Sequence, residues 1–233
     1  IRQHGQTPGD FGFTNTGRSD QNNVLGGDFI SQVIGHLSPN TPEVDVLVDG
    51  EIFLGNVPFP AVTAIGALPA GTYNVAVQAS INPGVFPIGP VDLDLEAGTW
   101  YTVLAVDFLE NIEPLILTDD ARPLATSAKV RIVHASPTAQ DVDIYVTAPC
   151  ADINDVDPTL TAVPFKANTG YIPLQSGTYE VTVTPTGTKD IAIGPAEILI
   201  ENGGVYTAIA RDPVPGSMEF GLIVLVDELI EAL

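Results

Sequence analysis

Apolar and polar residues alternate with a period of two in several short stretches of the chain. Examples are VDVLV at 44–48, YNVAV at 73–77 and VDLDLE at 91–96. Because successive side chains of a strand point to opposite faces, this pattern predicts half-buried antiparallel strands with one solvated face. The 22 Gly and 20 Pro residues fit short strands joined by tight turns. No long stretch shows the 3.6-residue period of a helix, so the sequence predicts an all-β protein.

The same succession of segments occurs twice along the chain. The first copy opens with VIGHLSPNTPEVDVLV at 33–48, and the second contains VRIVHASPTAQDVDIYV at 130–146. In both copies His-x-Ser-Pro is followed by a polar turn and Val-Asp. The motifs Val-Pro-Phe, Gly-Thr-Tyr and Ile-Gly-Pro then follow in the same order. The second copy differs mainly by an insertion, TAPCADINDVDPT at 147–159. A repeat of this length indicates two copies of one domain.

The size of each repeat limits the architecture. A unit of roughly 95 residues with about seven strands is typical of an immunoglobulin-like β-sandwich. We therefore predict two tandem antiparallel β-sandwich domains at residues 33–120 and 129–233, joined by a semi-stiff linker at 121–128. Residues 1–32 belong to neither repeat and are predicted to form an extended N-terminal arm.

The predicted arm is rich in Gly, Asn and Gln, a composition that does not form a core of its own. Phe11 and Phe13 share strand parity, and Gly12 between them permits close backbone approach. We expect the apolar residues of the arm to anchor it in a neighbouring copy, with packing on its own first domain as the alternative. These predicted assembly residues are Phe11, Phe13, Val24, Leu25, Phe29 and Ile30.

Several segments are similar to a known family. The stretches KVRIVHASPTAQDVDIYVTAP at 129–149, GTYEVTVTPTGT at 177–188 and VYTAIA at 205–210 resemble the bacterial domain of unknown function 4397. The resemblance covers about residues 33–226 and is closer in the second repeat, because Leu47 of the first stands where the second has Tyr145. It implies secreted or surface-attached β-domains, often in tandem, without an established activity.

The charge of the chain is strongly unbalanced. Its 29 acidic residues against 8 basic ones give a net charge of −21 over 233 residues. Nucleic acid and anionic membranes both require a basic surface, so neither is an expected partner. No apolar stretch is long enough for membrane insertion. The acidic excess fits a well-solvated secreted surface or, as the alternative, adaptation to high salt.

Two further features bear on the compartment. Ile1 fits a mature chain after signal removal as well as a chain with further residues before it. The single Cys150 means that the chain forms no internal disulfide, which is compatible with export but does not require it. We expect a secreted protein located outside the cell or on its surface.

The repeated motif contains the residue types of a nucleophilic hydrolase. The two sets are His36, Ser38 and Asp45, and His134, Ser136 and Asp143. Strand parity places His134 on the core face and Asp143 on the solvent face, so the three side chains do not converge. No Gly-x-Ser-x-Gly sequence is present. We therefore interpret His36 and His134 as buried structural residues that tie a strand end to the next turn. We expect no enzyme, with a secreted hydrolase as the alternative.

The insertion of the second repeat contains alternating oxygen ligands of the kind that Ca²⁺ prefers. These weak metal candidates are Asp152, Asn154, Asp155 and Asp157. The Gly and the distal Glu of an EF-hand are missing, so the sequence favours a solvated loop. Three scattered His and one Cys make no zinc site. We expect neither a metal nor a cofactor.

Together these observations predict a non-catalytic extracellular structural protein. Two β-domains with a detached arm suit self-association into a polymer, such as a cell-surface filament or matrix, because an added strand makes a contact that propagates. The alternative is an adhesion module that binds a glycan or a surface protein.

Overall fold

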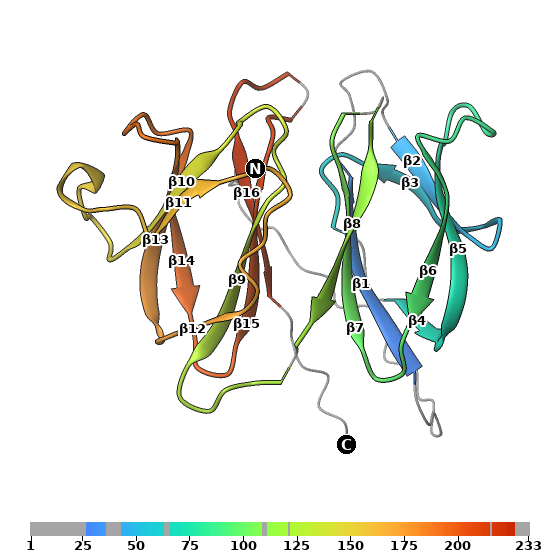
Figure 1. Ribbon diagram of the computed structural model, residues 1–233, viewed down its shortest axis with the longest axis horizontal. Helices are drawn as coiled ribbons and strands as arrows, with labels where there is room; N and C mark the ends of the chain where they lie inside the picture. The colour runs from blue at the N-terminus through green and yellow to red at the C-terminus, as the bar shows by residue number, and fades with distance from the viewer. Residues whose placement is uncertain are drawn as a thin grey trace, which may run out of the picture.

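The computed structural model describes residues 27–35, 43–62, 66–108, 111–120, 122–214 and 216–226. They form two β-sandwiches that lie side by side (Figure 1). This confirms the prediction of an all-β protein with two tandem sandwich domains. Within these residues no helix has the length and apolar character needed to cross a membrane.

The first sandwich contains eight strands: β1 (Gly27–Gly35), β2 (Glu43–Val48), β3 (Glu51–Pro58), β4 (Gly66–Pro69), β5 (Gly71–Ala79), β6 (Ile88–Leu95), β7 (Trp100–Val106) and β8 (Glu113–Asp119). They make two sheets with the strand orders β3-β2-β5-β6 and β4-β1-β7-β8. Asp49 and Gly50, with φ of 51° and 82°, form the two-residue turn between β2 and β3. An Asp-Gly pair favours this left-handed hairpin turn.

The second sandwich repeats this order. Its strands are β9 (Ala128–His134), β10 (Val142–Thr147), β11 (Leu160–Val163), β12 (Ile172–Leu174), β13 (Gly177–Pro185), β14 (Ile193–Ile200), β15 (Val205–Arg211) and β16 (Gly221–Val226). The sheets are β11-β10-β13-β14 and β12-β9-β15-β16. Each strand of one sandwich thus has a counterpart eight strands away, and β9 begins at the last residue of the predicted linker.

One strand pair in each sandwich departs from the purely antiparallel arrangement expected from the sequence. β1 runs parallel to β7, and β9 runs parallel to β15. The two strands of each parallel pair come from opposite ends of their domain. The chain between them passes through the other sheet, which supplies the long connection that parallel neighbours require.

The predicted boundary of the N-terminal arm at Gln32 is wrong. Residues 27–32 lie in β1, where Phe29 pairs with Ala67 of β4 and with Trp100 of β7. Backbone hydrogen bonds to neighbours on both sides place this polar stretch in the sheet, although its composition does not predict a strand. Phe29 and Ile30 therefore pair within the chain's own first domain. The assembly residues Phe11, Phe13, Val24 and Leu25 lie outside the described residues.

The inner sheets, β4-β1-β7-β8 and β12-β9-β15-β16, face each other across the boundary between the two domains (Figure 1). A separate apolar core fills each sandwich, and a third cluster joins the inner sheets. Leu104 and Leu117 from the first domain pack in it with Val133 and Ile209 from the second. Strands such as β7, β9 and β15 are consequently buried along nearly their whole length, unlike the half-buried strands that alternation predicts.

A buried ion pair lies in this interface. The Arg131 Nη1 atom is 2.7 Å from Asp119 Oδ1, and both side chains are at most 3 % exposed. The guanidinium also donates to the hydroxyls of Thr102 and Thr207, at 3.1 Å and 3.0 Å, and Thr102 donates to Asp119. Tyr171 covers the guanidinium at 4.7 Å. This network contains residues of both domains and fixes their relative orientation.

Candidate functional sites: the repeated motif and an apolar cavity

His134 lies at the end of β9 and is fully buried. Its Nε2 atom is 2.6 Å from the carbonyl oxygen of Gln140, and its Nδ1 atom is 3.4 Å from the backbone N of Ser136. A neutral ring with its proton on Nε2 satisfies both contacts. Burial lowers the pKa of His134, against the opposite effects of the Gln140 carbonyl and of Asp212. The ring therefore joins the strand end to the turn that follows.

Asp143 is buried, and the prediction that it faces the solvent is wrong. Its carboxylate accepts hydrogen bonds from the backbone N–H groups of Ala162 at 2.9 Å and Gly187 at 2.8 Å. The bulge of β11 at Ala162 and the turn at Gly187 thus cover the face that strand parity assigned to water. Burial by itself raises the pKa of Asp143, but the hydrogen bonds outweigh it and hold the pKa below its ordinary value.

Asp45 occupies the equivalent place in the first sandwich. It accepts from the backbone N–H of Asn56 at 2.9 Å, from Ser80 Oγ at 2.5 Å and from Gln78 Nε2 at 3.1 Å. The Ser80 and Asn56 hydrogen bonds lower the pKa of Asp45. Asn56 and Ala162 both have left-handed backbones, with φ of 55° and 50°, at irregularities in strand pairing. The repeated Asp therefore stabilises the same strained bulge in each domain.

Ser136 contacts an acid that sequence reasoning missed. Its hydroxyl donates directly to Asp212, which follows β15, and Thr138 Oγ1 donates to the same carboxylate at 2.8 Å. Ser136 and Asp212 are 1 % and 3 % exposed. Asp212 was not predicted because it lies 76 residues away in sequence. Only the parallel pairing of β9 with β15 brings the two strand ends together.

These contacts do not form a nucleophilic triad. The Ser136 hydroxyl is bonded to Asp212 rather than to the imidazole, and the Nε2 atom of His134 points to a backbone carbonyl. A triad requires the base to accept the nucleophile's proton at an accessible point. The second motif therefore stabilises the end of the sandwich. In the first motif, His36 and Ser38 lie outside the described residues.

The insertion of the second repeat is held by a lysine. It contains a short 3₁₀ helix, η1 (Ile153–Asp155), and the carboxylate of Asp152 accepts from the backbone and side-chain nitrogens of Asn154 at 2.9 Å and 2.8 Å. Lys189 Nζ donates to the carbonyls of Ile153 and Val156, the latter at 2.8 Å. Lys189 is exposed, so its ammonium group binds these loop carbonyls at the surface of the domain. Across the described parts of the chain, no group of three or more His, Cys, Asp or Glu residues is placed to hold a metal ion.

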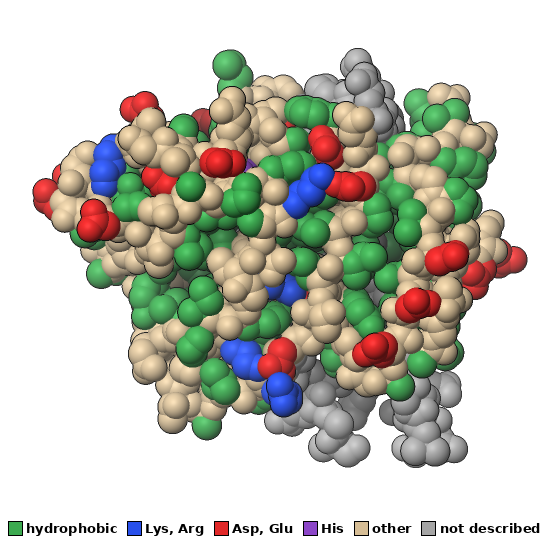
Figure 2. All heavy atoms as spheres, viewed as in Figure 1, with side chains coloured by type: hydrophobic (Ala, Val, Ile, Leu, Met, Phe, Trp, Pro, Cys, Tyr) green, Lys and Arg blue, Asp and Glu red, His purple; other side chains and the backbone are tan. Residues whose placement is uncertain are grey.

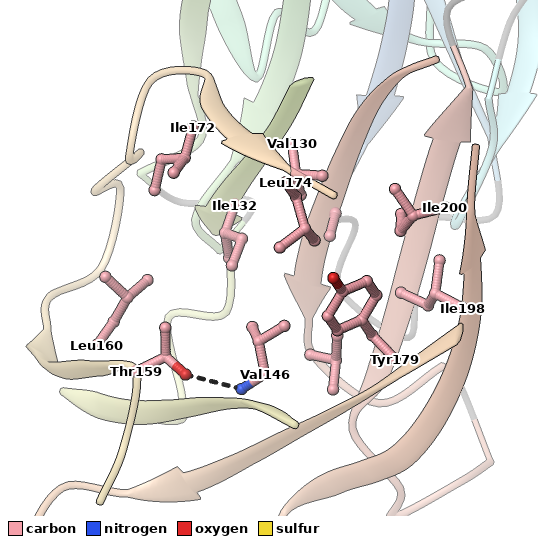
Figure 3. Close-up of a pocket in the computed structure, with 12 residues that line it drawn as sticks. Val130, Ile132, Val146, Thr159, Leu160, Ile172, Leu174, Tyr179, Ile198 and Ile200 are labelled. Atoms are coloured by element: carbon pink, nitrogen blue, oxygen red, sulfur yellow. Dashed lines mark hydrogen bonds between the residues drawn. The ribbon is translucent and has the colours of Figure 1, made fainter. Parts of the chain in front are cut away.

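An apolar cavity of about 100 Å³ lies between the two sheets of the second sandwich (Figure 3). Its floor is buried and includes Ile132, Val181 and Ala208. Its rim is half-buried or exposed, and Ile172 on β12 is 44 % exposed, so the cavity opens to the surface. The complete lining is Val130, Ile132, Val146, Thr159, Leu160, Ile172, Leu174, Tyr179, Val181, Ile198, Ile200 and Ala208. None of these residues is charged.

Residues 33–145 and 146–232 match the family described as Domain of unknown function (DUF4397). The chain belongs to this family. The resemblance inferred from the sequence is therefore confirmed, and so is its occurrence in two tandem segments. The boundary between the two DUF4397 matches falls inside β10 rather than in the connection between β8 and β9. The search of curated proteins finds no match to the chain.

The cavity lies where the two DUF4397 repeats differ most. In the first, β3 pairs with β2 as far as Leu47↔Ile52 and Val48↔Glu51. In the second, the pairing of β11 with β10 ends at Ile144↔Leu160. The insertion replaces the two-residue hairpin turn, and Pro158 stands where Ile52 does. Proline has no N–H to continue the ladder, so the edge strand is cut short beside the cavity mouth.

Proposed function

We propose that this chain is a non-catalytic extracellular structural protein that assembles with copies of itself through its N-terminal segment, residues 1–26. The observation that carries the proposal is the start of β1 at Gly27. The sheet β4-β1-β7-β8 is complete from that residue onward, with strands on both sides of β1. The sheets of the first sandwich therefore do not require residues 1–26. We assign this segment to binding a partner.

The chemistry of the segment supports contact with a protein surface. Phe11 and Phe13 are two residues apart and lie on one side of any extended strand. Burial of a Phe side chain contributes roughly 1.5–3 kcal/mol, and strand addition supplies backbone hydrogen bonds as well. Insertion of one copy's segment into the next leaves the second copy's own segment available. Such a contact does not close on itself and propagates into a filament or matrix.

The body of the protein suits a subunit of such an assembly. The apolar cluster between the inner sheets and the Arg131–Asp119 ion pair hold the two sandwiches in one orientation. Lys166 and Glu113 form a further ion pair between the domains at the surface. A body of fixed shape gives every joint in a polymer the same geometry. Figure 2 shows acidic side chains spread over the visible face, which supports a location in an aqueous extracellular medium.

Deletion of residues 1–26 tests this function. We expect the truncated protein to keep its far-ultraviolet circular dichroism spectrum and thermal transition and to remain monomeric in sedimentation velocity. The full chain should form polymers visible by negative-stain electron microscopy at high protein and salt concentration. A truncated protein that forms the same polymer, or a full chain that stays monomeric, contradicts the proposal. The deletion stops at residue 26 because β1 begins at Gly27.

A second candidate function, adhesion to a surface protein, is favoured by an exposed apolar loop between β5 and β6. Ile81, Val85 and Phe86 are 62 %, 57 % and 44 % exposed in it. Exposed apolar clusters of this kind occur at protein-binding surfaces. Under this alternative, the full chain is monomeric, and Phe86→Ser abolishes its attachment to cells without changing its folding.

A further inference from the structure

We propose that the apolar cavity of the second sandwich is the acceptor site for the N-terminal segment of another copy of the chain. The inference rests on the proposed self-assembly and names the surface that the segment binds. The occupant is residues 8–16, PGDFGFTNT, with Phe11 and Phe13 directed toward the cavity and its rim.

The first argument is the shortened edge of the outer sheet. In the described part of the chain, no strand lies beside the last residues of β10 on the side where β3 covers β2 in the first sandwich. There the backbone N–H of Val146 donates to the exposed Thr159 hydroxyl at 3.0 Å instead of to a strand. A hydroxyl contact of this kind is readily exchanged for a backbone carbonyl. An extended segment that displaces Thr159 can therefore pair with the last residues of β10, as β3 pairs with the last residues of β2 in the first sandwich.

The second argument is that the cavity and its open apolar rim offer a surface for aromatic side chains. The cavity lies directly next to this edge, and Val146, Thr159 and Leu160 belong to its lining (Figure 3). Its volume of about 100 Å³ is below that of the apolar cavity of about 150 Å³ that accepts one benzene, so it takes one ring at most, and the second ring packs on the exposed apolar rim at Ile172. In a strand added here, Phe11 and Phe13 are two residues apart, so both rings point to the same face of the sheet. Gly12 between them places no side chain on the opposite face.

The third argument is the distribution of charge. In residues 1–26 Arg2 and Arg18 balance Asp10 and Asp20, so the whole net charge of −21 lies in residues 27–233. Two such bodies repel each other strongly, whereas residues 1–26 are neutral as a whole and the inserted stretch 8–16 carries a single charge, at Asp10, so the segment approaches a body at a much smaller cost. The cavity lining contains no charged residue that would require a partner. Electrostatics therefore selects the segment over another part of the body as the occupant.

The length of the segment permits contact with a second copy. Phe13 precedes Gly27 by fourteen residues. An extended stretch of this length reaches about 45 Å, enough to leave the body in which it begins. Insertion into the chain's own cavity is the outcome to be excluded. Only insertion into another copy propagates an assembly.

The proposal is tested with full-length variants in which either the cavity or the N-terminal segment is defective. Ile172→Glu places a charge on the cavity rim, and Phe11→Ser/Phe13→Ser removes the two anchors. Leu199→Glu is the matched control, because Leu199 is 62 % exposed on β14 and lies between two lining residues without lining the cavity itself. We expect the wild-type and Leu199→Glu proteins to polymerise, and the Ile172→Glu and double-Phe variants to sediment as monomers.

Mixing the two defective variants gives a sharper result. The Ile172→Glu protein still carries an intact segment, and the double-Phe variant still carries an intact cavity. An equimolar mixture should therefore form heterodimers and nothing larger. A mixture that remains monomeric, or an Ile172→Glu protein that polymerises like the wild type, overturns the acceptor assignment. In the latter case, loss of polymers in the double-Phe variant still supports self-assembly, so the two proposals fail separately.

A peptide experiment leaves the cavity unchanged and guards against misfolding of Ile172→Glu. The exposed Cys150 in the neighbouring insertion accepts a fluorescent label on the double-Phe variant. A synthetic peptide of residues 8–16 should bind with a saturable fluorescence change, whereas the peptide with both Phe replaced by Ser should not. Absence of binding overturns the acceptor assignment. Binding combined with a monomeric wild-type protein shows insertion into the chain's own cavity and contradicts both proposals.

Discussion

The two sandwiches follow the same strand order but end one edge strand differently. In the first, Asp49 and Gly50 turn β2 directly into β3, which then covers the whole edge of β2. In the second, an insertion follows β10, and β11 pairs only with its first half. Both nevertheless hold the bulge of this strand with a buried Asp, Asp45 or Asp143. The comparison teaches that the repeated motif maintains the fold. The apolar cavity, by contrast, lies where the sequences of the two repeats diverge.

The largest expected effect concerns the interface, where the second repeat has Arg131 at the position of Val33 in the first. Arg131→Val leaves Asp119 buried without its cation, and breaking such a pair costs about 3–5 kcal/mol. Urea unfolding followed by circular dichroism measures this loss. The double variant Arg131→Val/Asp119→Val removes both charges and should recover most of the stability. A double variant as unstable as the single one would show that the ion pair is not the cause.

The repeated Asp gives the next effect and compares the repeats directly. Asp143→Ala leaves two backbone donors unpaired, those of Ala162 and Gly187, whereas Asp45→Ala leaves one, that of Asn56. Each buried unpaired group costs about 1–3 kcal/mol. Ser80 and Gln78 also donate to Asp45, but their side chains can rotate to other partners, whereas backbone N–H groups cannot, so Asp143→Ala should be the more destabilising change. Urea midpoints at pH 7 measure the difference. The matched Asn variants keep an acceptor oxygen and should fall between Ala and wild type; an equal loss for both Ala variants argues against the backbone contacts as the source.

His134 should make stability depend on pH near neutrality. Because burial lowers the pKa of His134, the unfolded chain takes up a proton first as the pH falls below the ordinary value of 6.5. The contribution of the neutral ring is thus fully present above that value and declines below it. Thermal melts between pH 5 and 8 should show this slope in the wild type. His134→Gln keeps a donor for the Gln140 carbonyl and should flatten the slope; an unchanged slope would assign it to another group.

Salt should produce the smallest change, a gradual rise in melting temperature with KCl. The net charge of −21 repels itself, and the screening length falls from about 10 Å at 0.1 M salt to about 3 Å at 1 M. Differential scanning calorimetry at several KCl concentrations tests the high-salt interpretation, and a flat or falling response removes it. Millimolar CaCl₂ serves as the comparison. A rise with Ca²⁺ at matched ionic strength that Asp152→Asn abolishes would assign a metal to the insertion of the second repeat.

Much of the architecture follows from local pattern. The period of two predicts the strands, and the repeat predicts two domains with the insertion at 147–159. The sequence also indicates that strands of the inner sheets are covered on both faces. The segments VLAV at 103–106 and AIA at 208–210 are continuous apolar runs rather than alternating ones. Such runs are typical of strands covered on both faces. They indicate burial but not which surface provides the cover.

The contacts of the motif were not predictable in the same way. Strand parity places Asp143 on the outer face of its sheet, but it does not show that the bulge at Ala162 and the turn at Gly187 cover that face. Asp212 meets Ser136 only because two strands from opposite ends of the domain run parallel. The cavity depends on how far β11 extends, and Pro158 marks that limit only once the pairing of β11 with β10 is known. Local sequence carries little information on any of these.

The near-continuous burial of β7, β9 and β15 has a consequence for what counts as a unit of this protein. The four sheets form four stacked layers, and the inner two are covered on both sides like the middle of one large domain. Separating the repeats would expose Leu104, Leu117, Val133 and Ile209 and leave Arg131 without Asp119. The segment that is duplicated in sequence is therefore half of the cooperative unit. Heat should melt both halves in a single transition, as in a protein with one core.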